Sequence, residues 1–518
     1  MVITSPFPAL EIPDLALADY VFEHVVRHAD RPALIDGETG AVTTHGELAA
    51  QVRAVAAGLT ERGVGSGDVV GIFSPNVTDY PAAFLGVAAA GATNTTANAL
   101  YGVEELAFQL RNCRARMLIT HPALGQVARA AAAEVGISDV VSFGELDGAT
   151  PFAGLRSNGP APLPTIDPAV DAVSLPYSSG TTGLPKGVRL THTNLVANVC
   201  QCEQIFEMGP QDVIMGILPF FHIYGQTVVM CAGLRAGASI VTMARFDLEQ
   251  FLALIQQYRA TRAFVAPPIV VAFAKHPLID KYDTSSLVHV MSGAAPLDGE
   301  VAAAAGARIG CRIIQGYGMT EASPVITCTS AFGEDRPGSV GPLVANTEGR
   351  IVDPETCVDV GPGEPGELWA RGPQVMPGYL NNDEATAATL PEGGWLRTGD
   401  IAVADADGWI TITDRAKELI KVSGYQVAPA ELEALLLTHP NVTDACVIGI
   451  PDEQSGERPK AFVVLREPVE EAELIAWMRE RTSPHKRLAA VEVINEIPKS
   501  ASGKILRRVL VERERAGR

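Results

Sequence analysis

The sequence lacks the features that mark membrane and exported proteins. It contains no run of about 18 apolar residues, and the small-residue stretch 82–92 is too short to span a bilayer. The first residues have no basic start followed by an apolar core, and the last residues form no peroxisomal or retention tripeptide. These absences predict a cytoplasmic protein.

Positive charge is also scarce. The formal net charge is −20, from 40 Lys and Arg against 60 Asp and Glu. This balance argues against binding to nucleic acid or to an anionic membrane, because both need a broad positive surface. The eight cysteines are scattered, and only Cys200 and Cys202 lie close together. A Cys-x-Cys pair without a second pair or a nearby histidine is a poor zinc site, so we interpret the cysteines as structural.

Apolar residues are abundant, and their pattern predicts an α/β fold. They make up 47% of the 518 residues, enough for a large core and about three units of roughly 150 residues each. Short strand-like runs alternate with amphipathic stretches, which predicts parallel sheets covered by helices. The expected strands are 69–75, 172–178, 213–219, 238–243, 262–267 and 312–318. The expected helices are 46–63, 80–92 and 246–258, the last with Asp247 as its N-cap.

The second half of the chain changes character twice. Residues 338–413 are dense in Gly and Pro and contain short strand-like runs, which predicts antiparallel β structure. A compact α+β unit follows, with expected helices at 429–440 and 470–482 and strands at 444–450, 460–466 and 491–498. We therefore expect a large domain over 1–414, a hinge at 415–417 and a small domain over 418–518.

The segment YSSGTTGLPKG (177–187) has the composition of a phosphate-binding loop. Its glycines let backbone amides turn toward an anion, its hydroxyls add donors, and Lys186 adds positive charge. It is not a P-loop, because Lys186 is followed by glycine. A flexible surface loop is the alternative reading of this composition alone.

This segment resembles the phosphate loop of the acyl-adenylate-forming superfamily, which includes acyl-CoA synthetases, peptide-synthetase adenylation domains and beetle luciferases. Four further segments match the family in order, namely QGYGMTE (315–321), TGD (398–400), DRAKELIKVSGYQ (414–426) and PKSASGK (498–504). The similarity runs from about residue 20 to residue 511. It implies a large N-terminal domain of two βα-type subdomains plus a small β-rich subdomain, followed by a small mobile α+β domain.

The resemblance implies a two-step ligase that uses ATP, Mg2+ and coenzyme A. The enzyme would form acyl-AMP and pyrophosphate from a carboxylic acid, and coenzyme A would then replace AMP. Lys504 would stabilise charge between the carboxylate and the α-phosphate, and Glu321 would hold Mg2+ beside Thr320. The residues implied at ATP or AMP are Ser178, Ser179, Gly180, Thr181, Thr182, Gly183, Lys186, Gln315, Gly316, Tyr317, Gly318, Met319, Thr320, Asp400 and Arg415.

The family pattern also implies a domain rotation about Lys417 between the two steps. One pose would bring Lys504 to the site. The other pose would bring the segment with Lys421, Ser423, Gly424 and Gln426 beside the incoming thiol. Ser423 departs from plant-type relatives, which often carry lysine there, and the departure concerns the contacts with coenzyme A.

The run LPFFHIYG (218–225) resembles the edge of the acyl pocket in 4-coumarate:CoA ligases. By this resemblance His222 separates the acyl pocket from the ATP site. The implied pocket residues are His222, Tyr224, Val228, Ser292, Gly293, Ala294, Gly316, Gly318, Pro324 and Val325. Glycines beside an aromatic ring suit a planar hydroxycinnamate or cinnamate, and a medium-chain fatty acid is the alternative.

Three other functions share these motifs to different degrees. A ligase that loads a carrier protein would pass the acyl group to a phosphopantetheine arm, and a luciferase-like oxygenase would use the same adenylate. A catalytically inactive nucleotide-binding regulator would be expected to lack Lys504, Glu321 or Asp400, and all three are present. The expected partners are small molecules, with no nucleic acid and no membrane, and the chain is a monomer or a homodimer.

Overall fold

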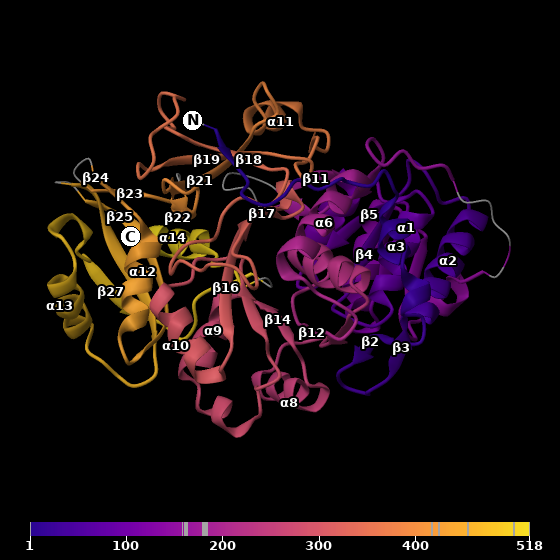
Figure 1. Ribbon diagram of the computed structural model, residues 1–518, viewed down its shortest axis with the longest axis horizontal. Coiled ribbons are helices and arrows are strands. Elements are labelled where there is room, and N and C mark those ends of the chain that lie inside the picture. The colour runs from indigo at the N-terminus through magenta and orange to yellow at the C-terminus, as the bar shows by residue number, and fades with distance from the viewer. Residues whose placement is uncertain are drawn as a thin grey trace.

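The computed structural model describes residues 2–157, 159, 164–178, 185–415, 418–422, 425–452, 455–500 and 503–516. These residues form four sheets with their covering helices. In Figure 1 the first part of the chain, in indigo and purple, lies on the right, and the last part, in yellow, lies on the left. A smaller β-rich unit lies above them and includes β18, β19 and β21.

The first sheet has a parallel centre, as the alternating pattern predicts. Its strands run in the order β10–β11–β9–β5–β4–β6–β7–β8, and β20 pairs with β11. The strands are β4 (Val69–Phe73), β5 (Thr93–Ala97), β6 (Met117–Thr120), β7 (Asp139–Ser142), β8 (Thr150–Pro151), β9 (Ala172–Ser174), β10 (Tyr177–Ser178), β11 (Lys186–Thr191) and β20 (Gly378–Tyr379). The predicted strand 69–75 is confirmed, and the predicted strand 172–178 is divided into β9 and β10.

Helices α2 (His45–Glu61), α3 (Tyr80–Ala89), α4 (Val103–Asn112) and α5 (Gly125–Val135) accompany this sheet. Helix α2 begins at a capping box in which Thr44 and Glu47 each accept the other's backbone N–H. The residues of α3 from Tyr80 to Ala88 are all buried, so this helix lies inside the core. The expected helices at 46–63 and 80–92 are confirmed.

The second sheet is parallel except at its two edge strands. Its order is β17–β16–β15–β14–β12–β13–β2–β3, with β3 and β17 antiparallel to their neighbours. The strands are β2 (Pro32–Asp36), β3 (Val42–Thr44), β12 (Val213–Gly216), β13 (Ser239–Thr242), β14 (Arg262–Val265), β15 (His289–Ser292), β16 (Arg312–Gly318) and β17 (Val325–Cys328).

The helices beside this sheet are α1 (Leu17–Phe22), α6 (His192–Phe206), α7 (Ala232–Arg235), α8 (Leu248–Tyr258), α9 (Pro267–Lys275) and α10 (Gly299–Ile309), with a π-helix over Tyr224–Cys231. Helix α8 begins as predicted, because the side chain of Asp247 accepts the backbone N–H of Gln250. It buries Phe251, Leu252 and Ile255 on one face.

The β-rich region after residue 338 is antiparallel, as predicted. Its sheet has the order β1–β18–β19–β21–β22. The elements are β1 (Ile3–Thr4), β18 (Glu348–Val352), β19 (Gly366–Arg371), β21 (Leu396–Ala404) and β22 (Ile410–Arg415), with helix α11 (Asp383–Thr389) between β20 and β21. The N-terminal strand β1 completes one edge of this sheet, a pairing that the local pattern did not predict.

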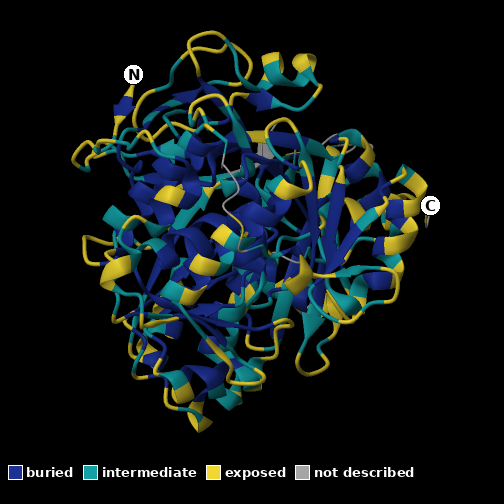
Figure 2. Cartoon of the chain, turned by 90° about the vertical axis from the view of Figure 1, so that its right-hand side faces the viewer, coloured by how far each residue is buried: buried dark blue, intermediate teal, exposed yellow. Residues whose placement is uncertain are grey.

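The C-terminal region forms a sheet with its own apolar core. The strands are β23 (Ile420–Val422), β24 (Tyr425–Val427), β25 (Val442–Asp452), β26 (Gly456–Leu465) and β27 (Ala490–Val493), and the helices are α12 (Pro429–Thr438), α13 (Glu471–Arg481) and α14 (Arg507–Ala516). Leu432, Leu436, Val447, Val463 and Leu474 are buried together between this sheet and its helices. Figure 2 shows buried residues along the inner strands and exposed residues on outer turns.

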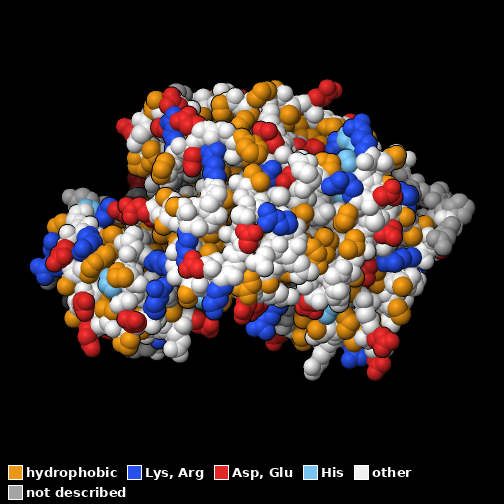
Figure 3. All heavy atoms as spheres, turned by 60° about the horizontal axis from the view of Figure 1, so that its bottom comes forward, with side chains coloured by type: hydrophobic (Ala, Val, Ile, Leu, Met, Phe, Trp, Pro, Cys, Tyr) orange, Lys and Arg blue, Asp and Glu red, His pale blue; other side chains and the backbone are white. Residues whose placement is uncertain are grey.

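The surface carries both signs of charge. On the face shown in Figure 3, Lys and Arg side chains are interspersed with Asp and Glu side chains. Among the described residues, no helix combines the length and apolar character that a bilayer span requires.

Candidate active site

The predicted phosphate loop lies at the end of a β-hairpin. Tyr177 pairs with Gly187 and Ser178 pairs with Lys186, so β10 and β11 enclose the residues between them. Ser179, Gly180, Thr181, Thr182 and Gly183 lie outside the described residues. The described ends of the loop are therefore fixed to the edge of the first sheet.

Glu321 is held beside this hairpin by neutral donors. Its Oε1 accepts hydrogen bonds from Ser178 Oγ at 2.9 Å and from Tyr379 Oη at 2.8 Å, and the residue is only 5% exposed. Burial and the neighbouring Glu321 raise the pKa of Tyr379, which keeps the phenol protonated as a donor. The ammonium of Lys186 lies 5.0 Å from the centre of the Tyr379 ring.

The surroundings of Glu321 fit a divalent cation. A buried carboxylate normally requires a cation, and no described Lys or Arg forms an ion pair with Glu321. Among the described residues, no three His, Cys, Asp or Glu side chains cluster as a metal cage. This arrangement suits Mg2+, which is commonly held by one or two carboxylates together with substrate phosphates.

The turn after β16 brings Glu321 to this position. A Cβ atom at Gly318 would lie 2.1 Å from the carbonyl oxygen of Pro324, so only glycine permits this close approach. Met319 N donates to Pro324 O at 3.0 Å and closes the turn. A 3-10 helix over Thr320–Ala322 follows, and it places Glu321 one residue beyond Thr320.

Asp400 is in direct contact with Tyr317 of β16. Tyr317 Oη donates to Asp400 Oδ2 at 2.5 Å. In the sheet, Asp400 is the antiparallel partner of Arg415 on β22, and of Arg415 only the backbone is described. The structure thus brings together Tyr317, Asp400 and the backbone of Arg415, which were all predicted at the nucleotide. Gln315, buried in β16, lies two residues before Tyr317.

Two of the predicted acyl-pocket residues, Gly293 and His222, lie against Tyr224. This residue is buried at the start of the π-helix, and its Oη lies 3.4 Å from Met291 O. A Cβ atom at Gly293 would lie 3.2–3.3 Å from the Tyr224 ring, so the missing side chain leaves space that this ring occupies. Val228 and Val325 are buried, whereas Ala294 is exposed and has φ +73°.

The sequence suggested that Gly316 and Gly318 leave open space in the acyl pocket, but the structure shows protein atoms at both positions. A Cβ atom at Gly316 would lie 2.6 Å from Cε of Met291, and at Gly318 the backbone of Pro324 fills the same position. These glycines therefore permit close packing, and the space beside their Cα atoms is filled by protein. Ser292 is 2% exposed, and its Oγ has no hydrogen-bond partner among the described residues.

Lys504, near the C-terminus of the sequence, influences His222 of this site. Burial and the positive charge of Lys504 together lower the pKa of His222 to about 4, so the imidazole is neutral at neutral pH. The loop that carries Lys504 is closed by Ser500 N donating to Lys504 O at 2.8 Å. A Cβ atom at Gly503 would lie 2.7 Å from Cβ of Ala266, so this loop packs against the second sheet region.

The residues predicted for thiol transfer lie elsewhere. Lys421 is exposed on β23, where its backbone N donates to Glu457 Oε2 at 2.8 Å. Gln426, of which only the backbone is described, pairs with Lys421. Figure 1 shows β23 and β24 at the left edge, away from β11 and β16. Ser423, Gly424 and the predicted hinge residue Lys417 lie outside the described residues.

Two buried residues that the sequence analysis missed hold the segment before His222. Asn76 donates to Gly216 O and Leu218 O at 2.9 and 2.8 Å and accepts from Phe220 N. Thr96 donates to Phe221 O at 2.7 Å. Asn76 follows a buried parallel strand, and a polar residue at that position is a signal for a site at the carboxyl edge of a sheet.

Comparison with known proteins agrees with this geometry. The model of AMP-binding enzymes matches residues 21–380, and the model of the AMP-binding enzyme C-terminal domain matches residues 431–504. A curated relative, 4-coumarate--CoA ligase 5 of Oryza sativa subsp. japonica, is 43% identical over all of this chain and 98% of its own length.

Solved structures show the same architecture. The anthranilate CoA ligase AuaEII in complex with anthranoyl-AMP has a TM-score of 0.91 at 28% identity, over 98% of both chains. ATP-bound MatB from Rhodopseudomonas palustris has a TM-score of 0.88 at 28% identity, over 96% of this chain and 98% of MatB. Apo MatB from the same organism has a TM-score of 0.78 at 27% identity, also over 96% of this chain and 98% of MatB. The chain therefore belongs to the family of AMP-binding enzymes, within the acyl-adenylate-forming superfamily.

Proposed function

We propose that this protein is an ATP-dependent acid–CoA ligase. The carboxylate of an acid attacks the α-phosphate of ATP and releases pyrophosphate, and the thiol of coenzyme A then displaces AMP from the acyl-AMP. The observation that carries the proposal is that the C-terminal loop with Gly503 and Lys504 packs against Ala266, next to the second sheet. The full-length similarity to 4-coumarate--CoA ligases supports the same reaction.

In the first step, fixed polar groups bind the nucleotide. Asp400 and Arg415 would hold the ribose, and the hydroxyl-rich segment 177–187 with Lys186 would bind the phosphates. Lys504 stabilises the negative charge that develops as the acid attacks phosphorus. Mg2+ bound at Glu321 would neutralise charge on the phosphates. Neutral His222 separates the carboxylate from the apolar pocket without adding charge.

The second step requires a different arrangement of the C-terminal domain. We assign residues 1–414 to the nucleotide- and acid-binding domain, 415–417 to the hinge with Lys417, and 418–518 to the mobile domain. Lys421, Ser423, Gly424 and Gln426 would reach the thiol only after rotation, because β23 lies far from β16 in Figure 1. The greater similarity to ATP-bound MatB than to apo MatB supports a pose suited to the first step.

The acid is a hydroxycinnamate or a related aryl acid. Gly293 lies against the ring of Tyr224, whose Oη is 3.4 Å from Met291 O, and an aromatic side chain at this position favours an aryl acid. The curated relative named above acts on 4-coumarate, and AuaEII acts on anthranilate, which is also an aryl acid. An aryl acid is therefore favoured over a medium-chain fatty acid.

The partners are the acid, ATP and coenzyme A. The reaction needs no nucleic acid and no membrane, and the net charge of −20 disfavours both as partners. We propose that the protein works in the cytoplasm, as a monomer or a homodimer.

The test separates the two half-reactions. With ATP, Mg2+ and 4-coumarate, the protein should release about one pyrophosphate per active site, and addition of coenzyme A should give continuous turnover and 4-coumaroyl-CoA. A carrier-loading ligase would release pyrophosphate but form no acyl-CoA. Absence of acid-dependent pyrophosphate release would refute the proposal.

A further inference from the structure

The segment that carries Asp400 is a bulge in β21. Glu367 of β19 is the partner of Ile401, and Trp369 is the partner of Arg397. An advance of two residues along β19 therefore corresponds to four residues along β21. Residues 398–400 bulge out opposite Leu368, and such bulges redirect side chains next to functional sites.

A bulge leaves backbone groups without partners in the ladder, and here side chains supply them. Gly399 N donates to Glu367 Oε1 at 3.0 Å, at a φ of +73° that favours glycine. Asp400 N donates to Thr398 Oγ1 at 3.1 Å, and Thr398 Oγ1 donates to Leu368 O at 2.7 Å. The direction in which the bulge presents Asp400 thus depends on the carboxylate of Glu367.

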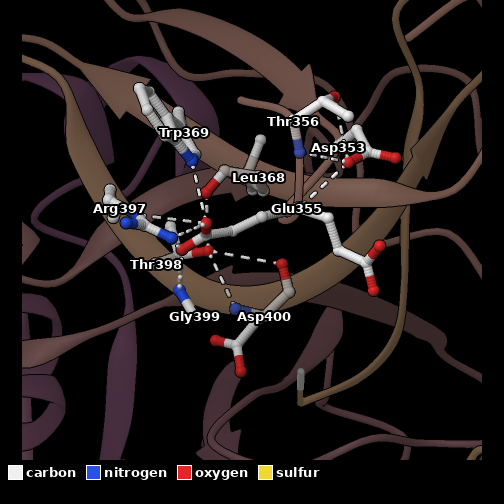
Figure 4. Close-up of polar contacts among 10 residues, drawn as sticks. Asp353, Glu355, Thr356, Leu368, Trp369, Arg397, Thr398, Gly399 and Asp400 are labelled. Carbon is white, nitrogen blue, oxygen red and sulfur yellow. Dashed lines mark hydrogen bonds and ion pairs between the residues drawn. The ribbon is translucent and has the colours of Figure 1, made fainter. Parts of the chain in front are cut away.

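Glu367 is itself fixed on its other oxygen. Its Oε2 accepts from Trp369 Nε1 at 3.0 Å and from Arg397 Nη2 at 2.8 Å, and Glu367 is 3% exposed. Figure 4 shows Trp369, Arg397 and Gly399 directed toward one shared carboxylate, with Asp400 beside it. Arg397 compensates the charge of this buried carboxylate, and the neutral N–H donors fix its orientation.

We propose that Glu367 is a positioning residue for the ribose of the nucleotide. This inference rests on the proposed function, because it assumes that Asp400 receives the ribose hydroxyls. Tyr317 orients the Asp400 side chain by its hydrogen bond, and Glu367 orients the Asp400 backbone through Gly399. Glu367 lies behind the bulge and acts without touching the nucleotide.

The neighbouring strand offers a matched control. Glu348 on β18 pairs with Arg371 Nε at 2.7 Å, and that guanidinium lies 4.5 Å from the Trp395 ring. Glu348 therefore forms a Glu–Arg pair beside a tryptophan in the same sheet, although it is more exposed than Glu367, and none of its described hydrogen bonds reaches the bulge. Glu348→Ala should reproduce any general weakening of the sheet without disturbing the bulge.

The experiment measures how strongly the protein distinguishes ATP from analogues that lack a ribose hydroxyl. We would measure kcat/KM for ATP, 2′-deoxy-ATP and 3′-deoxy-ATP, and the binding of each by calorimetry without acid, for wild type, Glu367→Ala, Glu367→Gln, Asp400→Ala and Glu348→Ala. Glu367→Ala should lower kcat/KM for ATP by about tenfold or more and lower it by a smaller factor for 2′-deoxy-ATP and 3′-deoxy-ATP, because each analogue keeps only one of the two ribose hydroxyls. Glu367→Gln keeps an acceptor for Gly399 N, so it should retain more of the discrimination.

The outcomes distinguish the positioning role of Glu367 from the proposed function of the protein. Adding Glu367→Ala to Asp400→Ala should cause no further loss of discrimination, because both act on one contact. An equal loss for ATP and both deoxy analogues in Glu367→Ala and Glu367→Gln would overturn the positioning role and leave a structural one. A wild-type protein that binds no ATP would instead refute the proposed function.

Discussion

The proposed nucleotide side and the proposed acyl side of the site are held by different forces. On the nucleotide side, hydrogen bonds fix the groups, as in the contacts of Ser178 and Tyr379 with Glu321 and of Tyr317 with Asp400. On the acyl side, close packing defines the space, because Tyr224 occupies the position that a side chain at Gly293 would fill. Directional contacts specify a chemistry shared by many acids, whereas packing specifies which acid enters.

This difference implies that substitutions on the two sides should affect different kinetic constants. A change on the nucleotide side should weaken adenylation for every acid alike. A change on the acyl side should alter the ranking of acids and leave the KM for ATP unchanged. The following substitutions test this division, from the largest expected effect to the smallest.

Lys504→Ala should cause the largest loss. Adenylation should fall by about 10²–10³-fold, because a cation is removed from the developing charge, while thiol transfer from supplied acyl-AMP should persist. Pyrophosphate release and acyl-CoA formation from acyl-AMP measure the two steps separately. Lys499→Ala is the matched control, since Lys499 pairs with Asp444 within the C-terminal domain. An equal loss of both half-reactions in Lys504→Ala would contradict the assigned role.

Two glycine substitutions compare the sides directly. Gly318→Ala meets the backbone of Pro324 at 2.1 Å, which no side-chain movement relieves, so turnover should fall by about 10²-fold with every acid. Gly293→Ala meets only the Tyr224 ring at 3.2–3.3 Å, so kcat/KM for bulky aryl acids should fall by about tenfold. Substrate panels and the KM for ATP check both variants. A raised KM for ATP in Gly293→Ala would break the comparison.

Tyr379→Phe should have a moderate effect on the nucleotide side alone. It removes one hydrogen bond to Glu321 and keeps the ring beside Lys186, so the Mg2+ concentration for half-maximal adenylation should rise by about three- to tenfold. The titration should be run with two acids of different size. If the rise differed between the acids, Tyr379 would be acting on the acyl side as well.

The titration of His222 gives the smallest effect. Its pKa is about 4 in the folded protein and ordinarily 6.5, so the unfolded chain binds the proton more readily and the free energy of unfolding falls as pH drops through this window. The full shift corresponds to about 3.4 kcal/mol. His222 is only partly buried, so the expected loss of unfolding free energy on acidification is smaller, about 1–2 kcal/mol. The variant His222→Asn should not show this loss.

NMR titration of His222 tests its proximity to Lys504. The Lys504→Ala variant should have a His222 pKa above the wild-type value, because the nearby positive charge lowers it. Lys499→Ala should leave the His222 pKa at its wild-type value. An unchanged pKa in Lys504→Ala would show that the two residues lie apart in solution.

The sequence predicted groups that lie within continuous motifs. The turn that carries Glu321 and the bulge that carries Asp400 belong to short segments that match motifs of the family, and the resemblance implied their roles. The parallel sheets were predictable from the local pattern, since each strand and helix has its own period. The N-cap at Asp247, whose side chain accepts a hydrogen bond from Gln250 N, is one such local feature that the structure confirms.

Residues that act across the fold could not be predicted in this way. Tyr379 reaches Glu321 because β20 pairs with β11, which lies almost 200 residues earlier in the chain. Glu367 depends on a register shift between β19 and β21, and no local pattern indicates such a shift. Gly316 was interpreted as the wall of an open slot, but its neighbour Met291 belongs to another strand and fills that space.

Acyl-CoA formation across a panel of acids tests the central claim most directly. The panel should contain cinnamates, benzoates and short- to medium-chain fatty acids, each with ATP, Mg2+ and coenzyme A. The account predicts the highest kcat/KM for hydroxycinnamates, because the chain is 43% identical to a 4-coumarate--CoA ligase and the Tyr224 ring would lie beside a planar acid. A preference for fatty acids would contradict the proposed substrate while leaving the two-step reaction in place, and no acyl-CoA from any acid would contradict the ligase itself.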